Sequence, residues 1–293
     1  MRWRDLPIVA FDTETTGFAP EEGHRVIEVA AVSLRLDPSG RISQLRRHEW
    51  LVNPGIPIPR ESTEIHHIAN DDVAGKPPFA DVAREVWKLL DGALIVAHNL
   101  SFDKRHLGCE FTTAGLGSWP QPAAEADTLD MSHKFHREAK GHKLGDLCKR
   151  LEIQLEEAHR AGNDAEACGR CFVTLADRFS APETVPELAE WGDVMVDPPP
   201  GPFIKKDADG TLRFAGGPQD GEPALMHPGV LAWMTMARQR KDGRWDWRYP
   251  EDLRRWIDRY LRLRASGNFP QAMKGFGPAE WGIDPPLGHG FAG

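Results

Sequence analysis

The sequence predicts an α/β protein in which a mixed β-sheet is flanked by helices and followed by a smaller, partly helical C-terminal appendage. Short apolar strands alternate with amphipathic helices over the first 180 residues. Proline and glycine become frequent from about residue 181, which indicates a linker. Six of the ten tryptophans lie beyond residue 180, and disordered tails are poor in aromatic residues, so part of this region is expected to fold.

Four strands are expected. Residues 6–11 form a short apolar run that ends in acidic residues. Residues 25–36 alternate and are rich in valine and isoleucine, and residues 42–52 form a third strand after the Pro38–Gly40 turn. These two strands should pair as an antiparallel hairpin. The apolar run at 93–97 (ALIVA) is the fourth strand and is expected to be buried.

Helices are expected where apolar residues recur at helical spacing. These ranges are 79–90, a segment starting at Ser101, 143–151, 162–179, 230–237 and 250–263. The expected organisation is therefore a domain at 1–180, a Pro/Gly-rich linker at 181–210, and a small module at 211–293 whose last residues, 268–293, form an irregular tail.

Composition excludes several classes of protein. The chain has 40% hydrophobic and 27% charged residues, as in globular proteins, and a formal charge of −8. This acidity argues against coating nucleic acid through bulk charge, but not against an enzyme that handles nucleic acid at a metal site. No apolar stretch is long enough to span a membrane, and the start is not typical of a signal peptide. We therefore expect a cytoplasmic protein without a membrane partner, with its four cysteines as free thiols.

Acidic residues stand at the ends of three expected elements. Asp12 and Glu14 stand at the end of the first strand, and residues i and i+2 of a strand point to one face. Asp103 lies in the first turn of a helix after ALIVA, and Asp164 lies at another helix start, five residues after His159. Each acid alone at a helix start is most often an N-cap. Their combined order and spacing favours one shared site.

Four converging carboxylates suit hard divalent cations. Mg²⁺ takes one or two protein carboxylates and keeps several waters, so four acids can hold two ions. Two ions about 3.5–4 Å apart can activate water and stabilise a leaving oxygen in phosphodiester hydrolysis. Histidine is a common proton acceptor at such sites, and His159 has the right residue type. The predicted cofactor is a pair of Mg²⁺ ions, for which Mn²⁺ can substitute.

The motifs FDTETTG, AHNLSFD and AHRAGNDA resemble those of the DEDDh exonucleases, the DnaQ-like family of the proofreading subunit of bacterial replicative DNA polymerase. The resemblance covers residues 5–178 and includes STEIHHI, DTLDM and GHKLGDLCKRL. It implies a ribonuclease H-like fold and a 3′–5′ exonuclease that releases nucleoside 5′-monophosphates. By motif position it implies catalytic metal ligands at Asp12, Glu14, Asp103 and Asp164, and a general base at His159.

The resemblance also implies contacts to the terminal nucleotide. The residues concerned are Thr13, Thr15, Thr16, Gly17, Phe18, His66, His98 and Asn99. At His66 the family has a His-Gly-Ile segment, whereas this chain has His67 in place of the glycine, which puts the local loop shape in question. Asn99 could contact the substrate or hold its loop.

The C-terminal module faintly resembles a small module found after some exonucleases of this family. Residues 238–264 hold ten basic and five acidic side chains, with aromatic residues interleaved. Arg248, Arg254, Arg255 and Arg259 are the candidate nucleic-acid patch. The alternative is an amphipathic helix with a solvated arginine face, and the spacing of Trp256, Tyr260 and Leu263 favours a core position for these three residues.

The expected function is exonuclease action on the 3′ end of DNA, in replication, proofreading or repair. One alternative is an exonuclease that trims RNA or short oligonucleotides on the same fold, since nothing in the motifs reports on a 2′-hydroxyl. An alternative of another class is a subunit that docks on a DNA polymerase or another protein through residues 181–293.

Overall fold

The computed structural model describes residues 1–136, 138–192, 202–208, 212–239 and 245–247, with residues 249, 253, 254, 256, 257, 260 and 261. The chain divides into two compact units, Met1–Asp193 and Val194–Gly293. Within these described residues, no helix is both long and apolar enough to cross a membrane.

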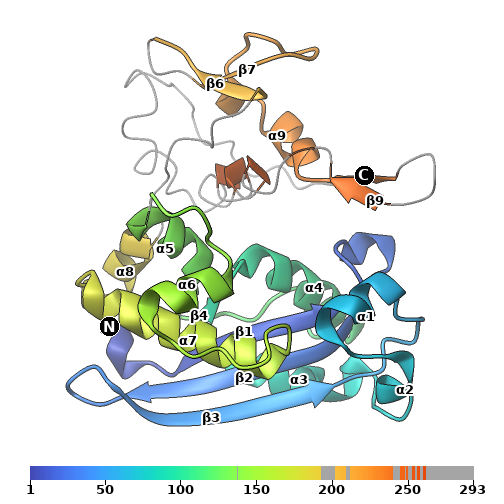
Figure 1. Cartoon of the computed structure of the whole chain (residues 1–293), viewed down its shortest axis with the longest axis vertical. Helices are drawn as coiled ribbons and strands as arrows, with labels where there is room; N and C mark the ends of the chain where they lie inside the picture. Colours follow the sequence, from blue (N-terminus) through green and yellow to red (C-terminus); the bar gives the residue numbers. More distant parts are fainter. Residues whose placement is uncertain are drawn as a thin grey trace. The chain divides into compact units, whose positions relative to one another are not determined.

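The first unit is built on a five-stranded mixed sheet in the order β3-β2-β1-β4-β5 (Figure 1). Strands β1 (Ile8–Thr15), β2 (Val26–Leu36) and β3 (Ile42–Leu51) are antiparallel neighbours. Strands β4 (Leu94–Ala97) and β5 (Ala124–Asp127) continue the sheet in parallel with β1. The predicted α/β class and the predicted hairpin are therefore confirmed.

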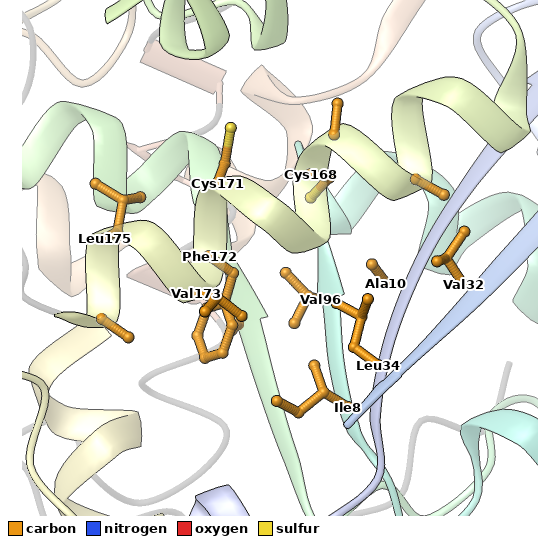
Figure 2. Close-up of a cluster of buried hydrophobic side chains, with 14 of the residues drawn as sticks. Ile8, Ala10, Val32, Leu34, Val96, Cys168, Cys171, Phe172, Val173 and Leu175 are labelled. Atoms are coloured by element: carbon orange, nitrogen blue, oxygen red, sulfur yellow. The ribbon is translucent and has the colours of Figure 1, made fainter. Parts of the chain in front are cut away.

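Helix α7 (Ala161–Arg178) covers one face of the sheet. Alternate residues of β1, Ile8 and Ala10, are fully buried beneath it. Figure 2 shows them beside Phe172 and Cys168 of α7. Helix α6 (Leu144–Leu151), which also belongs to this layer, packs on α7.

On the opposite face of the sheet lie the side chains of β1 that alternate with Ile8 and Ala10. Val9 and Phe11 are buried with α3 (Phe79–Leu90) and α4 (Leu100–Thr113). This division follows from the period of two along a strand, which sends successive side chains to opposite faces. The remaining helical elements of the unit are η1 (Trp3–Asp5), η2 (Pro20–Glu22), α1 (Arg60–His66), α2 (Asn70–Val73), α5 (Thr128–Phe135) and α8 (Val185–Gly192).

Two strands of this sheet differ from the expectation. The first strand was expected to end at Phe11, but β1 runs to Thr15, because its acidic half pairs with β2 as regularly as its apolar half does, up to a bulge after Glu14. Strand β5 was not expected. Its sequence AEAD has low strand propensity, and pairing with β4 holds it in place.

Helix α8 lies within residues that were expected to be linker. The chain before it returns to the N-terminus: Trp3 Nε1 donates to the Pro182 carbonyl at 2.7 Å, and Val185 N donates to the Met1 carbonyl at 3.1 Å. Leu188 is buried in the core beneath α7. These long-range contacts order a segment whose prolines suggested a linker.

The second unit has its own small core. Its elements are β6 (Ile204–Lys206), β7 (Leu212–Phe214), η3 (Ala224–Met226), α9 (Pro228–Met234), β8 (Ala237–Gln239) and β9 (Trp245–Trp247). The helix expected at 230–237 is thus shorter, and β8 begins at Ala237. Strand β6 lies within the range expected as linker, and the tail expected at 268–293 lies outside the described residues.

Candidate active site

Strand β1 continues beyond its pairing with β4, and this extension carries two carboxylates. Strand β4 pairs with β1 only over Ile8–Ala10. Since Ile8 and Ala10 face α7, the period of two places Asp12 and Glu14 on that same face. Asp12 is half-buried and Glu14 is 9% exposed. Strand β1 therefore places both predicted acids on one face, beside the start of α7.

The start of α7 supplies a third carboxylate and the histidine. Asp164 is 8% exposed, and its Oδ2 accepts a hydrogen bond from the backbone N of His159 at 2.9 Å. His159 is exposed and adopts a left-handed backbone conformation, with φ of 68°. Potential ligand atoms of Glu14, His159 and Asp164 all lie within 4.8 Å of one another. The structure thus brings these three predicted residues into one cluster.

The fourth carboxylate arrives from the other face of the sheet. Asp103, on the first turn of α4, is 2% exposed and accepts a hydrogen bond from Thr13 Oγ1 at 2.7 Å. The start of α4 is fixed by Asp127, whose carboxylate accepts from the backbone N of Asn99 and of Leu100, both at 3.0 Å. The hydrogen bond from Thr13 therefore holds Asp103 beside β1, and the hydrogen bonds to Asp127 fix the start of the helix that carries Asp103.

All four predicted ligand carboxyls have raised pKa values, and burial is the largest cause for each of them. Burial, followed by the charges of Asp103, Glu14 and Asp164, raises the pKa of Asp12 well above its usual range. Burial also raises the pKa of Glu14 to about 8 and that of Asp103 to about 7. Burial raises the pKa of Asp164. Such a cluster is stable with all its carboxylates ionised only when cations share the charge.

The donor set fits hard divalent ions. All four acidic side chains offer carboxylate oxygens, which are the ligands that Mg²⁺ and Mn²⁺ take in proteins. Asp164 Oδ1 is buried and makes no hydrogen bond to the described part of the chain. Asp164 Oδ2 accepts a hydrogen bond from the His159 backbone N, so Oδ1 is the oxygen that remains available to bind a cation.

The predicted threonine contacts have hydroxyls engaged inside the protein. Thr13 bonds Asp103, and Thr15 Oγ1 donates to the Gly17 carbonyl at 2.7 Å. Thr16 Oγ1 accepts from the backbone N of Arg25 at 2.9 Å. These hydroxyls shape the loop after β1.

Gly17 has no room for a side chain, because an added Cβ would lie 2.4 Å from the His24 ring. Its carbonyl also lies 3.0 Å from His106 Nε2, which ties the loop to α4. Phe18, by contrast, is 59% exposed, so its ring is the part of this loop presented to solvent.

Two of the three remaining candidates take part in the turn between β4 and α4. His98 Nδ1 lies 2.9 Å from Thr128 Oγ1. Asn99 is left-handed, with φ of 79°, and its Oδ1 accepts from Ser101 Oγ at 3.2 Å. Asn99 thus contributes one local side-chain hydrogen bond to this turn.

His66, the last of them, ends α1 and is 2% exposed, and its Nδ1 accepts from Ile68 N at 3.0 Å. Burial lowers its pKa. The next residue, His67, has φ of 60° and caps α1. Glycine adopts this conformation most readily, so His67 keeps the turn without the glycine of the family motif.

Most of the candidate nucleic-acid patch lies outside the described residues: Arg248, Arg255 and Arg259. Arg254 is half-buried, and its Nε donates to the Tyr249 carbonyl at 3.1 Å. Trp256 and Tyr260 are buried in the core of the second unit, which confirms the core interpretation for these two side chains. Leu263 lies outside the described residues.

Sequence reasoning missed two carboxylates that support the cluster, the half-buried Asp127 and the buried Glu28. Asp127 caps α5 and holds the start of α4. Glu28 is 5% exposed and lies opposite Glu14 in the β1–β2 register. A signal was present for Glu28, because a charged residue within an apolar stretch such as 26–32 is seldom buried without a partner.

The mixed sheet and the acidic cluster at the end of β1 define a nuclease-type domain with a ribonuclease H-like fold. The chain belongs to the exonuclease family whose RNase_T model matches residues 9–172. This finding confirms the family that the three motifs indicated.

Similar proteins were found by sequence and by structure. The 3′–5′ exonuclease DinG of Bacillus subtilis (strain 168) is 35% identical over 172 residues, which are 58% of this chain and 18% of that protein. A DNA polymerase III subunit epsilon-like protein of Rhodobacter capsulatus is 38% identical over 178 residues, which are 60% of this chain and 24% of that protein. The chain thus spans less than a quarter of the length of either relative.

A solved structure of E. coli exonuclease I with single-stranded DNA has a TM-score of 0.52 and 18% identity to this chain. The match covers 59% of this chain and 41% of that chain. This likeness shows the shared fold.

Proposed function

We propose that the protein is a 3′–5′ exonuclease that hydrolyses phosphodiester bonds at the 3′ end of DNA and releases nucleoside 5′-monophosphates. The observation that supports this proposal is the cluster of Glu14, His159 and Asp164, whose potential ligand atoms lie within 4.8 Å of one another. Asp12 and Asp103 belong to the same cluster, because the charge of Asp103 acts on the pKa of Asp12. DNA is favoured over RNA because similar proteins bear the names of DNA polymerase III components.

Asp12, Glu14, Asp103 and Asp164 would hold two Mg²⁺ or Mn²⁺ ions. Bound divalent ions supply a more acidic water and stabilise the charge on the leaving oxygen. Thr13 keeps one oxygen of Asp103 fixed by its hydrogen bond, and the His159 backbone does the same for Asp164.

His159 is proposed to take the proton from the attacking water. Its imidazole is exposed, so the proton can pass on to solvent. Its ring lies within reach of Glu14 and Asp164, which are two of the proposed ligands. His66 and the exposed ring of Phe18 are the side chains proposed to meet the terminal nucleotide.

The test is an assay of shortening with three matched substrates: 5′-labelled single-stranded DNA, duplex DNA with a 3′ mismatch, and RNA of the same sequence. Each is incubated with Mg²⁺, Mn²⁺ or EDTA. The expected result is a ladder that shortens from the 3′ end of DNA, disappears in EDTA, and disappears in Asp12→Asn.

Asp81→Asn is the control, because Asp81 is an exposed acid on α3, away from the cluster. Its activity should equal that of the wild type. If Asp12→Asn degrades DNA at the wild-type rate, the proposed active site is wrong. If RNA is shortened faster than DNA, the substrate assignment is wrong while the active site stands.

A further inference from the structure

Glu28 uses both carboxylate oxygens to hold the turn that carries His159. Its Oε1 accepts from Arg160 Nη2 at 2.8 Å. Its Oε2 accepts from the backbone N of Ala161 at 3.0 Å and from Arg160 Nε at 3.3 Å. Glu28 is therefore engaged with the two residues that directly follow His159.

This turn needs contacts from outside itself. His159 is left-handed, and Arg160, the N-cap of α7, is extended and makes no side-chain capping bond. A left-handed conformation is unfavourable for a non-glycine residue, so it persists where its surroundings hold it. Asp164 holds the turn through the His159 backbone N, and Glu28 holds it through Arg160 and Ala161.

We propose that Glu28 is a positioning residue for His159, which keeps the imidazole within reach of Glu14 and Asp164. The inference rests on the proposed function, in which His159 accepts a proton. A role for Glu28 as a further cation ligand is disfavoured, because both of its oxygens already accept hydrogen bonds from Arg160 and Ala161.

The chain contains a matched control. Glu110 on α4 is 4% exposed and accepts from Arg25 Nε and Nη2, both at 2.7 Å. It also accepts from the backbone N of Val26 at 3.3 Å. Glu110 thus binds an arginine and the following backbone N–H, as Glu28 does, but it does not contact residues 159–161. Glu110→Gln reproduces the loss of such a pair without touching the His159 turn.

The kinetic test is a double-mutant cycle at saturating Mn²⁺, in which the DNA concentration is varied so that kcat and KM are obtained separately. Glu28→Gln should lower kcat at least about tenfold and leave KM within about threefold, because a misplaced base affects the chemical step. In a His159→Ala background the same change should lower kcat less than about twofold, since no imidazole is left to misplace. Glu110→Gln should change kcat less than about twofold, because it leaves residues 159–161 untouched.

Equal losses from Glu28→Gln in both backgrounds, or an equal loss in Glu110→Gln, would overturn the proposal. A separate outcome concerns the proposed function: if His159→Ala alone keeps the wild-type kcat, the base assignment itself is wrong.

Hydrogen exchange on the metal-free full chain gives a reading independent of activity. The peptide covering residues 157–163 should exchange at least about threefold faster in Glu28→Gln than in the wild type, because the turn loses its anchor. The same peptide should be unchanged in Glu110→Gln. Unaltered exchange in Glu28→Gln would contradict the positioning role even if kcat fell.

Discussion

Replacing Glu14 with glutamine should stabilise the metal-free protein while it removes activity. Burial, together with the charges of Asp164 and Glu28, raises the pKa of Glu14 from 4.5 to about 8. The folded protein therefore keeps a proton at Glu14 that the unfolded chain releases. Stability contributed by that proton is lost as the pH rises from about 4.5 towards about 8.

The size of the effect follows from this pKa difference. At pH 7 ionisation of Glu14 in the unfolded chain disfavours folding by on the order of 3 kcal/mol, and at pH 5 by less than about 1 kcal/mol. Glutamine has the same length and carries no charge. Glu14→Gln should thus recover most of this free energy of unfolding at pH 7 to 8 and little at pH 5.

The assay is urea denaturation in EDTA at pH 5, 7 and 8. The second unit is the same in both proteins, so differences in unfolding free energy report on Glu14. Glu64→Gln is the control, because Glu64 is exposed and its pair with Arg60 should be worth less than about 1 kcal/mol. A Glu14→Gln protein that is less stable than the wild type at pH 8, or that gains equally at pH 5, would refute the reasoning.

Three further changes test other contacts. Thr13→Val removes the hydroxyl that donates to Asp103 and should lower kcat about tenfold. Thr13→Ser keeps a hydroxyl and should have a kcat near that of the wild type. Equal kcat values for the two variants in steady-state kinetics would contradict this. Gly169→Val should cost about 1–3 kcal/mol in urea denaturation, because even an added Cβ lies 2.6 Å from Leu34 Cδ1. Tyr260→Phe removes the 2.7 Å hydrogen bond that the buried Tyr260 hydroxyl donates to the Leu225 carbonyl and should cost about 0.5–1.5 kcal/mol, measured in the same way.

Periodicity and local motifs were sufficient to predict four of the five strands of the sheet and the acidic cluster. The apolar residues of β1 and β2 follow from burial of both faces of these strands, and the strand period of two places Asp12 and Glu14 on one face. The helix starts that carry Asp103 and Asp164 are local features that a sequence pattern can reveal. These predictions needed no knowledge of long-range contacts.

The features that were missed depend on contacts between distant residues. Strand β5 forms because β4 is available to pair with it, although its own residues favour other structure. The buried role of Glu28 depends on Arg160, which is 132 residues further along the chain. The engagement of the Thr13 hydroxyl depends on Asp103, 90 residues away. A single sequence does not state which of its distant residues will meet.

One face of β1 serves both folding and chemistry. Ile8 and Ala10 are buried against α7, and further along that face lie Asp12 and Glu14, beside the Asp164 of the same helix. Because close packing fixes α7 on the sheet, the carboxylates cannot move apart to relieve their repulsion. The apolar core beneath α7 therefore offsets the electrostatic cost of assembling the cluster. A cation that bound only the folded cluster would remove this cost, and by mass action it would stabilise the fold in addition to taking part in hydrolysis.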